Sequence, residues 1–246
     1  MKREGAVMEK AFDMNMIGDF VPTLTAYLPV TLYILTLSLL FGFVLGLFLA
    51  LPRIYNIPIV NQLAKVYISF FRGTPIMVQL FIVFYGIPAL TGLIGIDTSK
   101  MDPFYAAVAT YALSNAAAAA EIIRAGVGSV DKGQTEAAYS IGLSGSQAFR
   151  RIVLPQALVQ AFPNMGNMVI SSLKDTSLAF SIGVMDMSGR GQTLITSSNH
   201  SLEVYIALSI VYYAVAVLFE WFFRVAEKRI KKNQTRIVTV FDMNIH

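Results

Sequence analysis

Long apolar runs alternate with short polar stretches along this chain of 246 residues. Five runs stand out, at about residues 27–51, 76–94, 104–123, 152–173 and 204–225. Each is close to the roughly 20 residues that an α-helix needs to cross the hydrocarbon core of a membrane. The pattern predicts an all-α fold, an integral membrane bundle of five transmembrane helices that forms one domain over residues 1–246.

The stretches outside these runs are mixed in character. Residues 1–26 combine charges with scattered apolar residues, which is typical of a short amphipathic helix at the membrane surface. Residues 53–75 carry Arg53, Lys65 and Arg72 and are expected to connect the first two spans on one side of the membrane. Glu121 and Arg124 lie one helical turn apart at the end of the third span, where they are expected to pair.

Composition supports a membrane protein and excludes several kinds of chemistry. Hydrophobic residues make up 55% of the chain and charged residues only 14%. The chain has no cysteine and only two histidines, so disulfides, thiolate nucleophiles and a histidine-based metal site are not expected. It also lacks a Gly-x4-Gly-Lys-Ser/Thr loop and a nucleophile with a paired base, so we do not expect an enzyme. The net charge of +4 comes from Lys and Arg at the ends of apolar runs, which argues against a nucleic-acid partner.

Small and polar residues interrupt some of the apolar runs. Gly42 and Gly46 either let another helix approach closely or reflect the general frequency of glycine in membrane helices. Asn115 lies in mid-span beside the five alanines 116–120, and we expect it to face the bundle interior. The fourth run contains Pro163, Asn164, Gly166 and Asn167. This pattern predicts an interrupted helix beside a binding cavity, or else a kink whose freed carbonyls are satisfied by the asparagines.

A polar segment at residues 134–155 carries a spaced motif. Its members are Glu136, Ala137, Ala138, Gly142, Ile152, Leu154 and Pro155. The spacing Glu-Ala-Ala-x3-Gly-x9-Ile-x-Leu-Pro resembles the signature of the integral membrane subunits of binding-protein-dependent ABC importers. In that family the segment is a cytoplasmic coupling helix that docks onto a separate ATPase. The resemblance implies a type I ABC importer permease with Glu136 on an exposed face and Gly142 at a tight turn.

The same resemblance implies partners that this chain does not contain. These are ABC ATPase subunits that carry ATP and Mg²⁺, an extracellular amino-acid-binding protein, and a second permease subunit in a homodimer or heterodimer. No cofactor is expected in the chain itself. The mechanism implied is alternating access, in which closure of the ATPase pair moves the coupling helix and thereby the spans beside it.

Two further segments resemble the polar amino-acid branch of these permeases, namely Phe-Arg-Gly-Thr-Pro at residues 71–75 and Lys-Asp-Thr-Ser-Leu at residues 174–178. Residues 129–142 look most like cystine permeases within that branch, so L-cystine is the expected substrate. The candidate lining residues of the substrate path are Asn115, Ala118, Asn164, Asn167, Lys174, Asp175, Thr176 and Ser177. Lys174 and Asp175 would bind the two charges of a zwitterion or would pair with groups of the protein.

Orientation follows from the distribution of basic residues. Thirteen of the nineteen Lys and Arg residues fall on the side of the coupling segment, when residues 52–75 and the C-terminal tail are counted with it. This bias predicts a multi-pass protein of the bacterial cell membrane with its N-terminus outside and its C-terminus in the cytoplasm. The alternative function is a stand-alone channel or ion-coupled carrier for amino acids, which would usually need a buried acidic residue. Glu121 and Glu220 lie near span ends, which argues against this alternative.

Overall fold

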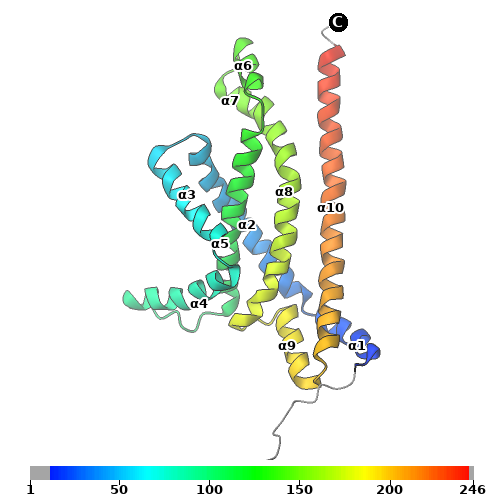
Figure 1. Ribbon diagram of the computed structural model, residues 1–246. Coiled ribbons are helices and arrows are strands. Elements are labelled where there is room, and N and C mark those ends of the chain that lie inside the picture. The colour runs from blue at the N-terminus through cyan, green and yellow to red at the C-terminus, as the bar shows by residue number, and fades with distance from the viewer. Residues whose placement is uncertain (1–11, 244–246) are drawn as a thin grey trace, which may run out of the picture.

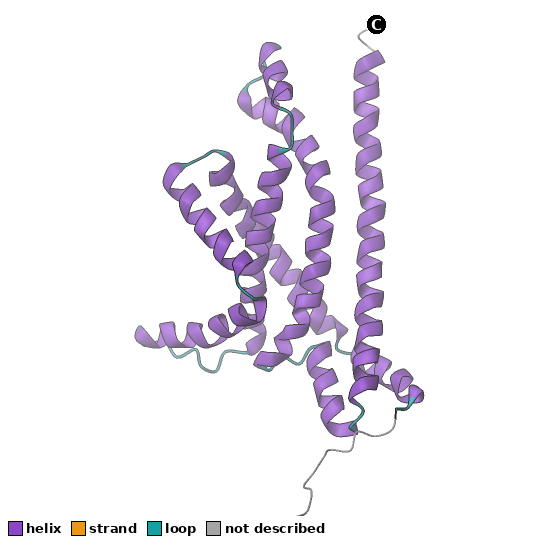
Figure 2. Cartoon of the chain, viewed as in Figure 1, coloured by secondary structure: helices purple, strands orange, loops and turns teal. Residues whose placement is uncertain are grey.

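The computed structural model describes residues 12–243 and the side chains of residues 12–232. Helices and their connecting turns account for this part of the chain, with no strand in residues 12–243 (Figure 2). The helices are α1 Met14–Thr25, α2 Leu28–Ile54, α3 Pro58–Gly73, α4 Ile76–Leu93, α5 Pro103–Gly128, α6 Lys132–Ser140, α7 Gly145–Ala148, the π-helical turn Phe149–Val153, α8 Leu154–Asp175, the 3-10 helix Thr176–Ile182, α9 Met187–Ser198 and α10 Ser201–Met243.

The axes of three long helices, α5, α8 and α10, are roughly parallel, with α8 running opposite to the other two, and α2 crosses them obliquely (Figure 1). α5 packs against α2 and α8, and α8 packs in turn against α10. The short helices α6 and α7 lie at one end of this bundle, and α1 and α9 lie at the other (Figure 1). We call these the α6/α7 end and the opposite end.

The contact between α2 and α5 depends on two glycines. A Cβ atom added at Gly42 would lie 2.7 Å from the Cβ of Asn115, and one added at Gly46 would lie 2.7 Å from the Cβ of Ala119. Both glycines therefore allow α2 to touch the alanine-rich side of α5, which confirms the close-approach interpretation of the Gly-x3-Gly pair.

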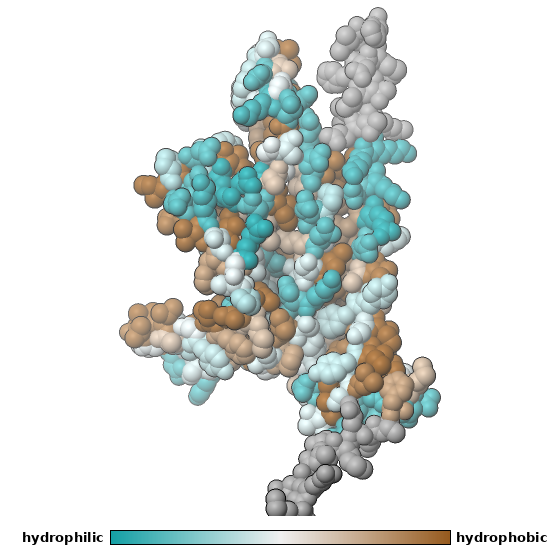
Figure 3. Space-filling view, viewed as in Figure 1, coloured by the Kyte–Doolittle hydropathy of each residue, from teal (hydrophilic) through white to brown (hydrophobic). Residues whose placement is uncertain are grey.

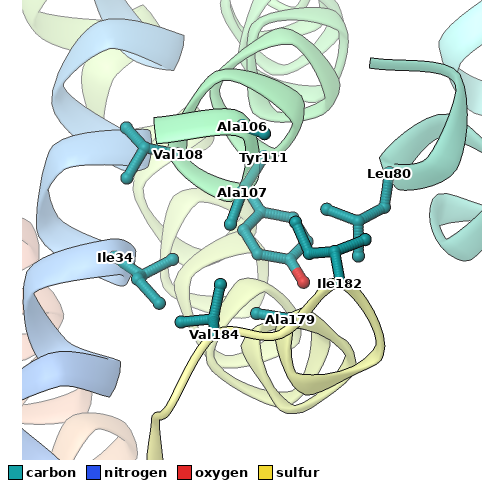
Figure 4. Close-up of a cluster of buried hydrophobic side chains, with 9 residues drawn as sticks. All are labelled: Ile34, Leu80, Ala106, Ala107, Val108, Tyr111, Ala179, Ile182 and Val184. Carbon is teal, nitrogen blue, oxygen red and sulfur yellow. The ribbon is translucent and has the colours of Figure 1, made fainter. Parts of the chain in front are cut away.

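A cluster of buried apolar residues ties the opposite end together. It joins α2, α4, α5 and the segment after α8 through Ile34, Leu80, Ala106, Ala107, Val108, Tyr111, Ala179, Ile182 and Val184 (Figure 4). A second cluster fastens α1 and α9 to α10 and includes Phe20, Leu24, Met187 and Val204. The amphipathic helix expected before the first span is therefore present as α1, while residues 1–11 lie outside the described part.

The described helices provide up to five membrane spans. α2, α4, α5 and residues 201–232 of α10 are each long and apolar enough to cross a membrane. A fifth span is formed if residues 145–182 and α9, which are bent by 52° relative to each other, are taken as one broken span. The expected all-α membrane bundle is thus confirmed, with four spans by length and composition, or five if the bent pair is one span.

The region before the second span differs from expectation. Residues 58–73, expected as a connector on the α6/α7 side, form α3, which runs back along α5 (Figure 1). The Tyr67 hydroxyl donates to the carbonyl of Leu113 at 2.8 Å, near the middle of α5. Arg72, one turn further on, therefore lies well away from the α6/α7 end and does not mark that boundary. α3 is amphipathic and packs on α5, and the sequence analysis did not predict this helix.

The fourth span also differs from expectation in one respect. α8 is continuous from Leu154 to Asp175 with Pro163 inside it, so the predicted interruption is wrong. At its start, the π-helical turn 149–153 joins α7 to α8 without a gap. Pro155 lies in the first turn of α8, a position that suits proline because it has no N–H to donate.

Candidate functional site

The motif segment folds into a short hairpin of α6 and α7. The Asp131 carboxylate caps α6 by accepting a hydrogen bond from the N–H of Gly133 at 2.7 Å. Gly142 follows α6 with φ +83°, a backbone conformation that favours glycine. Ser144 and Gln147 then form a capping box that starts α7. One helix therefore ends, the chain turns and the next helix begins within 14 residues of Asp131.

The motif residues divide between the two sides of this hairpin. Glu136, Ala137, Gly142 and Pro155 are exposed, whereas Ala138, Ile152 and Leu154 are buried or half-buried. Glu136 thus lies on an exposed face, as predicted. Ala138 is 1% exposed on α6, which packs against α7 and the π-helical turn, so a small residue suits this position.

Two large apolar residues of the hairpin are exposed to solvent, and the sequence analysis did not identify them as candidates. Tyr139 is 53% exposed and Ile141 is 75% exposed. Their position near Gly142, at the turn, was the feature of the sequence that could have indicated their exposure. An exposed aromatic and an exposed aliphatic residue at the tip of a polar hairpin are typical anchors for a partner protein.

The hairpin is joined to the bundle in two ways. The Gln156 side chain of α8 donates to the Gln134 side chain of α6 at 3.5 Å. Residues 145–175 are also helical without interruption, from α7 to the end of α8. A cavity of about 580 Å³ separates the rest of the hairpin from the ends of α2 and α5, lined among others by Tyr55, Lys132 and Phe149. The hairpin is thus continuous with α8 on one side and is joined to α5 by residues 129–131 on the other.

An ionic cluster fastens α2 to α5 at the same end. The Glu121 carboxylate pairs with Arg124, as predicted, and also with Arg53 from the end of α2. The Arg53 side chain is only 13% exposed, so its charge depends on Glu121 for compensation.

Three of the candidate path residues lie inside the subunit or at its edge. Asn115 is buried, and its Oδ1 accepts a hydrogen bond from Ser172 of α8 at 2.6 Å. Its Nδ2 has no partner among the described residues, and the same is true of the buried Tyr111 hydroxyl. Both groups line a small polar cavity that Asp175 also borders. Asn115 therefore faces the bundle interior, as predicted, and Ala118 is half-buried on the same helix.

The other candidates lie on α8 and on the 3-10 helix that follows it. Asn164, Asn167 and Lys174 are exposed, whereas Thr176 is buried. The Thr176 hydroxyl donates to the carbonyl of Leu173, and the Ser177 hydroxyl donates to the carbonyl of Lys174. The structure thus separates the eight candidates rather than gathering them in one pocket. Lys174 and Asp175 form no salt bridge with each other or with another described residue.

Asp186 is a buried polar residue whose importance the sequence did not reveal. Its carboxylate accepts hydrogen bonds from the N–H of Gly189 at 2.9 Å and from the Thr31 hydroxyl at 3.3 Å. The side chain is 0% exposed. Asp186 caps the start of α9 and links this helix to α2 through Thr31, which lies 155 residues earlier in the chain.

Comparison with known proteins places these features in a family. The model of the binding-protein-dependent transport system inner membrane component family matches residues 42–232. The probable amino-acid permease protein YxeN of Bacillus subtilis (strain 168) is 45% identical over 83% of this chain and 89% of that protein. The glutamine transport system permease protein GlnP of Escherichia coli (strain K12) is 36% identical over 89% of this chain and 98% of that protein.

A solved structure agrees with these relatives. The crystal structure of an amino acid ABC transporter with histidines contains a chain that is 30% identical to this one, with a TM-score of 0.80 over 89% of this chain and 100% of that chain. The protein belongs to the family of binding-protein-dependent transport system inner membrane components. Within this family it is a multi-pass permease subunit of an amino-acid ABC importer.

Proposed function

We propose that the α6/α7 hairpin is the docking element for a separate ATPase, and that this chain carries a polar amino acid across the membrane when the ATPase binds and hydrolyses ATP with Mg²⁺. The observation that carries this proposal is the exposed tip of the hairpin. Glu136, Tyr139 and Ile141 are uncovered there, beside a glycine held at positive φ. Residues 145–175 then connect this tip without a break to the far end of α8.

The proposed assembly includes two ATPase subunits, an extracellular amino-acid-binding protein and a second permease subunit, either identical or similar. The orientation places the α6/α7 end in the cytoplasm and the N-terminus outside. Arg53, Arg124, Arg150 and Arg151 support it, because they belong to the α6/α7 end.

For the substrate, we favour polar amino acids and, among these, L-cystine. The segments at residues 71–75, 129–142 and 174–178 are the support for this choice. Relatives that are 36% identical to this chain carry names for both glutamine and L-cystine transport. Uptake of labelled L-cystine, L-glutamine and L-arginine by the assembled complex in proteoliposomes would separate these candidates, and the proposal of L-cystine fails if only another amino acid accumulates.

Gly142→Asp tests the docking proposal. It places a carboxylate at the exposed turn and a side chain where φ is +83°. We expect normal membrane insertion but no ATP-dependent uptake and no ATPase recovered in a gentle detergent purification. Gly142→Asn is the matched control, because asparagine tolerates the left-handed region and adds no charge, so it should retain more uptake. Normal uptake by Gly142→Asp would refute the assignment.

A further inference from the structure

Exposed side chains change from apolar to basic along one face of α10. The apolar members are Ile210, Val217, Leu218, Trp221 and Phe222, and the basic members that follow are Lys228, Arg229 and Lys232. At about 3.6 residues per turn, Lys228 and Lys232 lie within about 20° of Trp221 around the helix, and Arg229 lies within about 20° of Phe222. Figure 3 shows this change along α10, from brown in its lower part to teal just below the grey residues. We call Lys228, Arg229 and Lys232 the α10 basic face.

The cations of the α10 basic face differ from their neighbours on the same helix. Arg224 pairs with Glu220, and Lys231 pairs with Glu227 at 2.6 Å. The α10 basic face forms no salt bridge and no hydrogen bond with another side chain of residues 12–232. All of its side chains are exposed. Its charges are therefore available to an external anion.

Contacts between α5 and α8 show where the membrane ends on the α6/α7 side. Asn115 of α5 lies beside Ser172 of α8, with 2.6 Å between Oδ1 and Oγ. Further along α5, a Cβ atom added at Gly126 would lie 3.0 Å from the Cβ of Ala161. Glu121 lies between these two contacts, so it is level with the middle of α8. Its carboxylate pairs with two arginines, and because such charges are costly in hydrocarbon, they mark the edge of the membrane core.

α10 reaches the same level at Phe223. A Cβ atom added at Gly166, in the middle of α8, would lie 3.0 Å from the Cγ of Phe223, so the two helices touch there. The axes of α5, α8 and α10 are roughly parallel (Figure 1), and Phe223 therefore lies at about the depth of Glu121. Trp221 and Phe222 are thus at the edge of the hydrocarbon core, where aromatic side chains are favoured.

The spacing along α10 puts the basic face at the height of the lipid headgroups. Lys228 lies about 10 Å beyond Trp221 along the helix, and Lys232 lies about 16 Å beyond it. The headgroup region is about 5–8 Å thick on each side of the hydrocarbon core. Long basic side chains bend back toward it along the helix surface. Lys228 and Arg229 therefore reach the headgroups, and Lys232 adds its charge within about one Debye length of 8–10 Å.

We infer that the α10 basic face binds anionic phospholipids in the leaflet on the α6/α7 side, with Lys228 and Arg229 donating hydrogen bonds to the phosphate oxygens. Lipid fits this surface because the same face is apolar as far as Trp221 and Phe222, so acyl chains cover its first part and a headgroup reaches its last. Charge-assisted hydrogen bonds to phosphate are stronger than neutral ones. Each Lys or Arg close to a negatively charged membrane surface increases binding about fivefold. The inference requires neither ATPase docking nor a substrate, so it goes beyond the proposed function.

Trp221 is a reporter at this surface, because it is the only tryptophan of the chain. The full chain is reconstituted in vesicles that mix phosphatidylglycerol with phosphatidylcholine brominated near the carbonyl end of its acyl chains. Bromine quenches the fluorescence of a nearby indole, so phosphatidylglycerol that displaces the brominated lipid increases the emission of Trp221. The dependence on lipid composition gives the ratio of the two lipid affinities. We expect a ratio of at least about fivefold in favour of phosphatidylglycerol.

Two double variants show whether the preference belongs to the α10 basic face. Lys228→Gln with Arg229→Gln removes two cations beside the reporter and should lower the ratio to below about twofold. The matched control, Arg150→Gln with Arg151→Gln, removes the same charge from exposed residues at the α6/α7 end. These arginines lie about 20 Å further along the bundle than Gly166, which is about two Debye lengths, so the control should keep the wild-type ratio.

The remaining outcomes contradict the inference. Equal affinity for the two lipids in the wild type, or an unchanged ratio in Lys228→Gln with Arg229→Gln, would overturn it. An equal loss in the control would also overturn it, because the preference would then reflect the net charge of the whole α6/α7 side. If Lys228→Gln with Arg229→Gln keeps the lipid preference but no longer retains the ATPase in a gentle detergent purification, the face contacts the ATPase and the lipid inference is wrong. Failure of the wild type to bind an ATPase would refute only the docking proposal, because the fluorescence measurement uses this chain alone.

Discussion

The packing of α2 against α5 leads to a quantitative prediction for Gly46→Ala. The added Cβ would lie 2.7 Å from the Cβ of Ala119 and 2.9 Å from the carbonyl oxygen of Ala116. Carbon atoms in contact normally lie about 3.5–4.0 Å apart, so the helices must separate by roughly 1 Å. The obstructing atoms belong to the backbone or are Cβ atoms, so no change of rotamer relieves the overlap.

The expected loss of stability follows from two opposing contributions. Overpacking of this kind costs about 1–3 kcal/mol, and replacing glycine by alanine inside a helix recovers up to about 1 kcal/mol. We therefore expect Gly46→Ala to lower the free energy of unfolding by about 1–2 kcal/mol. The double variant with Gly42→Ala should lose less than the sum of the single variants, because both glycines contact Ala116 and share one separation of the helices.

Reversible unfolding in mixed detergent micelles, followed by far-ultraviolet circular dichroism, measures this loss. Gly86→Ala in α4 is the matched control, because its added Cβ would meet nothing within 4 Å. The control should be neutral or slightly stabilising. If Gly46→Ala unfolds at the same denaturant concentration as the wild type and as Gly86→Ala, the close contact of α2 and α5 does not exist.

Three further predictions concern polar residues. Glu121→Gln leaves the half-buried Arg53 without a counter-charge and should lower the free energy of unfolding by about 1–3 kcal/mol, measured in the same micelles. The control is Glu220→Gln, which removes one partner of an exposed ion pair and should change the free energy of unfolding little. Asp186→Ala removes the cap of α9 and its bond to Thr31, so thermal unfolding in detergent should shift downward; Asp186→Asn, which keeps an acceptor, should shift less, and equal shifts would contradict the capping role. Asp175→Ala should lose ATP-dependent uptake while still assembling with the ATPase, and loss of assembly would instead show a structural role.

Local patterns predicted much of the architecture. The apolar runs located the spans because a helix in lipid must satisfy its backbone internally and cover it with apolar side chains. The motif located the hairpin because Gly142 needs positive φ and Ala138 needs a small side chain, both of which are visible as residue types. The pairing of Glu121 with Arg124 was predictable because residues three apart share a helix face.

The candidate path stays a prediction, because residue type does not determine which side of a helix is covered. Pro163, Asn164 and Asn167 suggested an interrupted helix, yet α8 is continuous. A proline in a membrane helix is tolerated when neighbouring helices support the turn, and only packing decides this. The Thr176 and Ser177 hydroxyls donate to carbonyls of the preceding turn, which residue type alone did not show.

The sequence by itself thus determined the membrane class, the helical fold and the position of the Glu-Ala-Ala motif, since these depend on composition and on short, fixed spacings. Tertiary structure decided how the pieces meet. It brought Arg53 to Glu121 and Thr31 to Asp186 across 68 and 155 residues, and it left the polar face of α8 uncovered while burying its apolar face. The reason is physical: a span can turn any of its faces toward its neighbours, and the choice is made by the packing of the whole bundle.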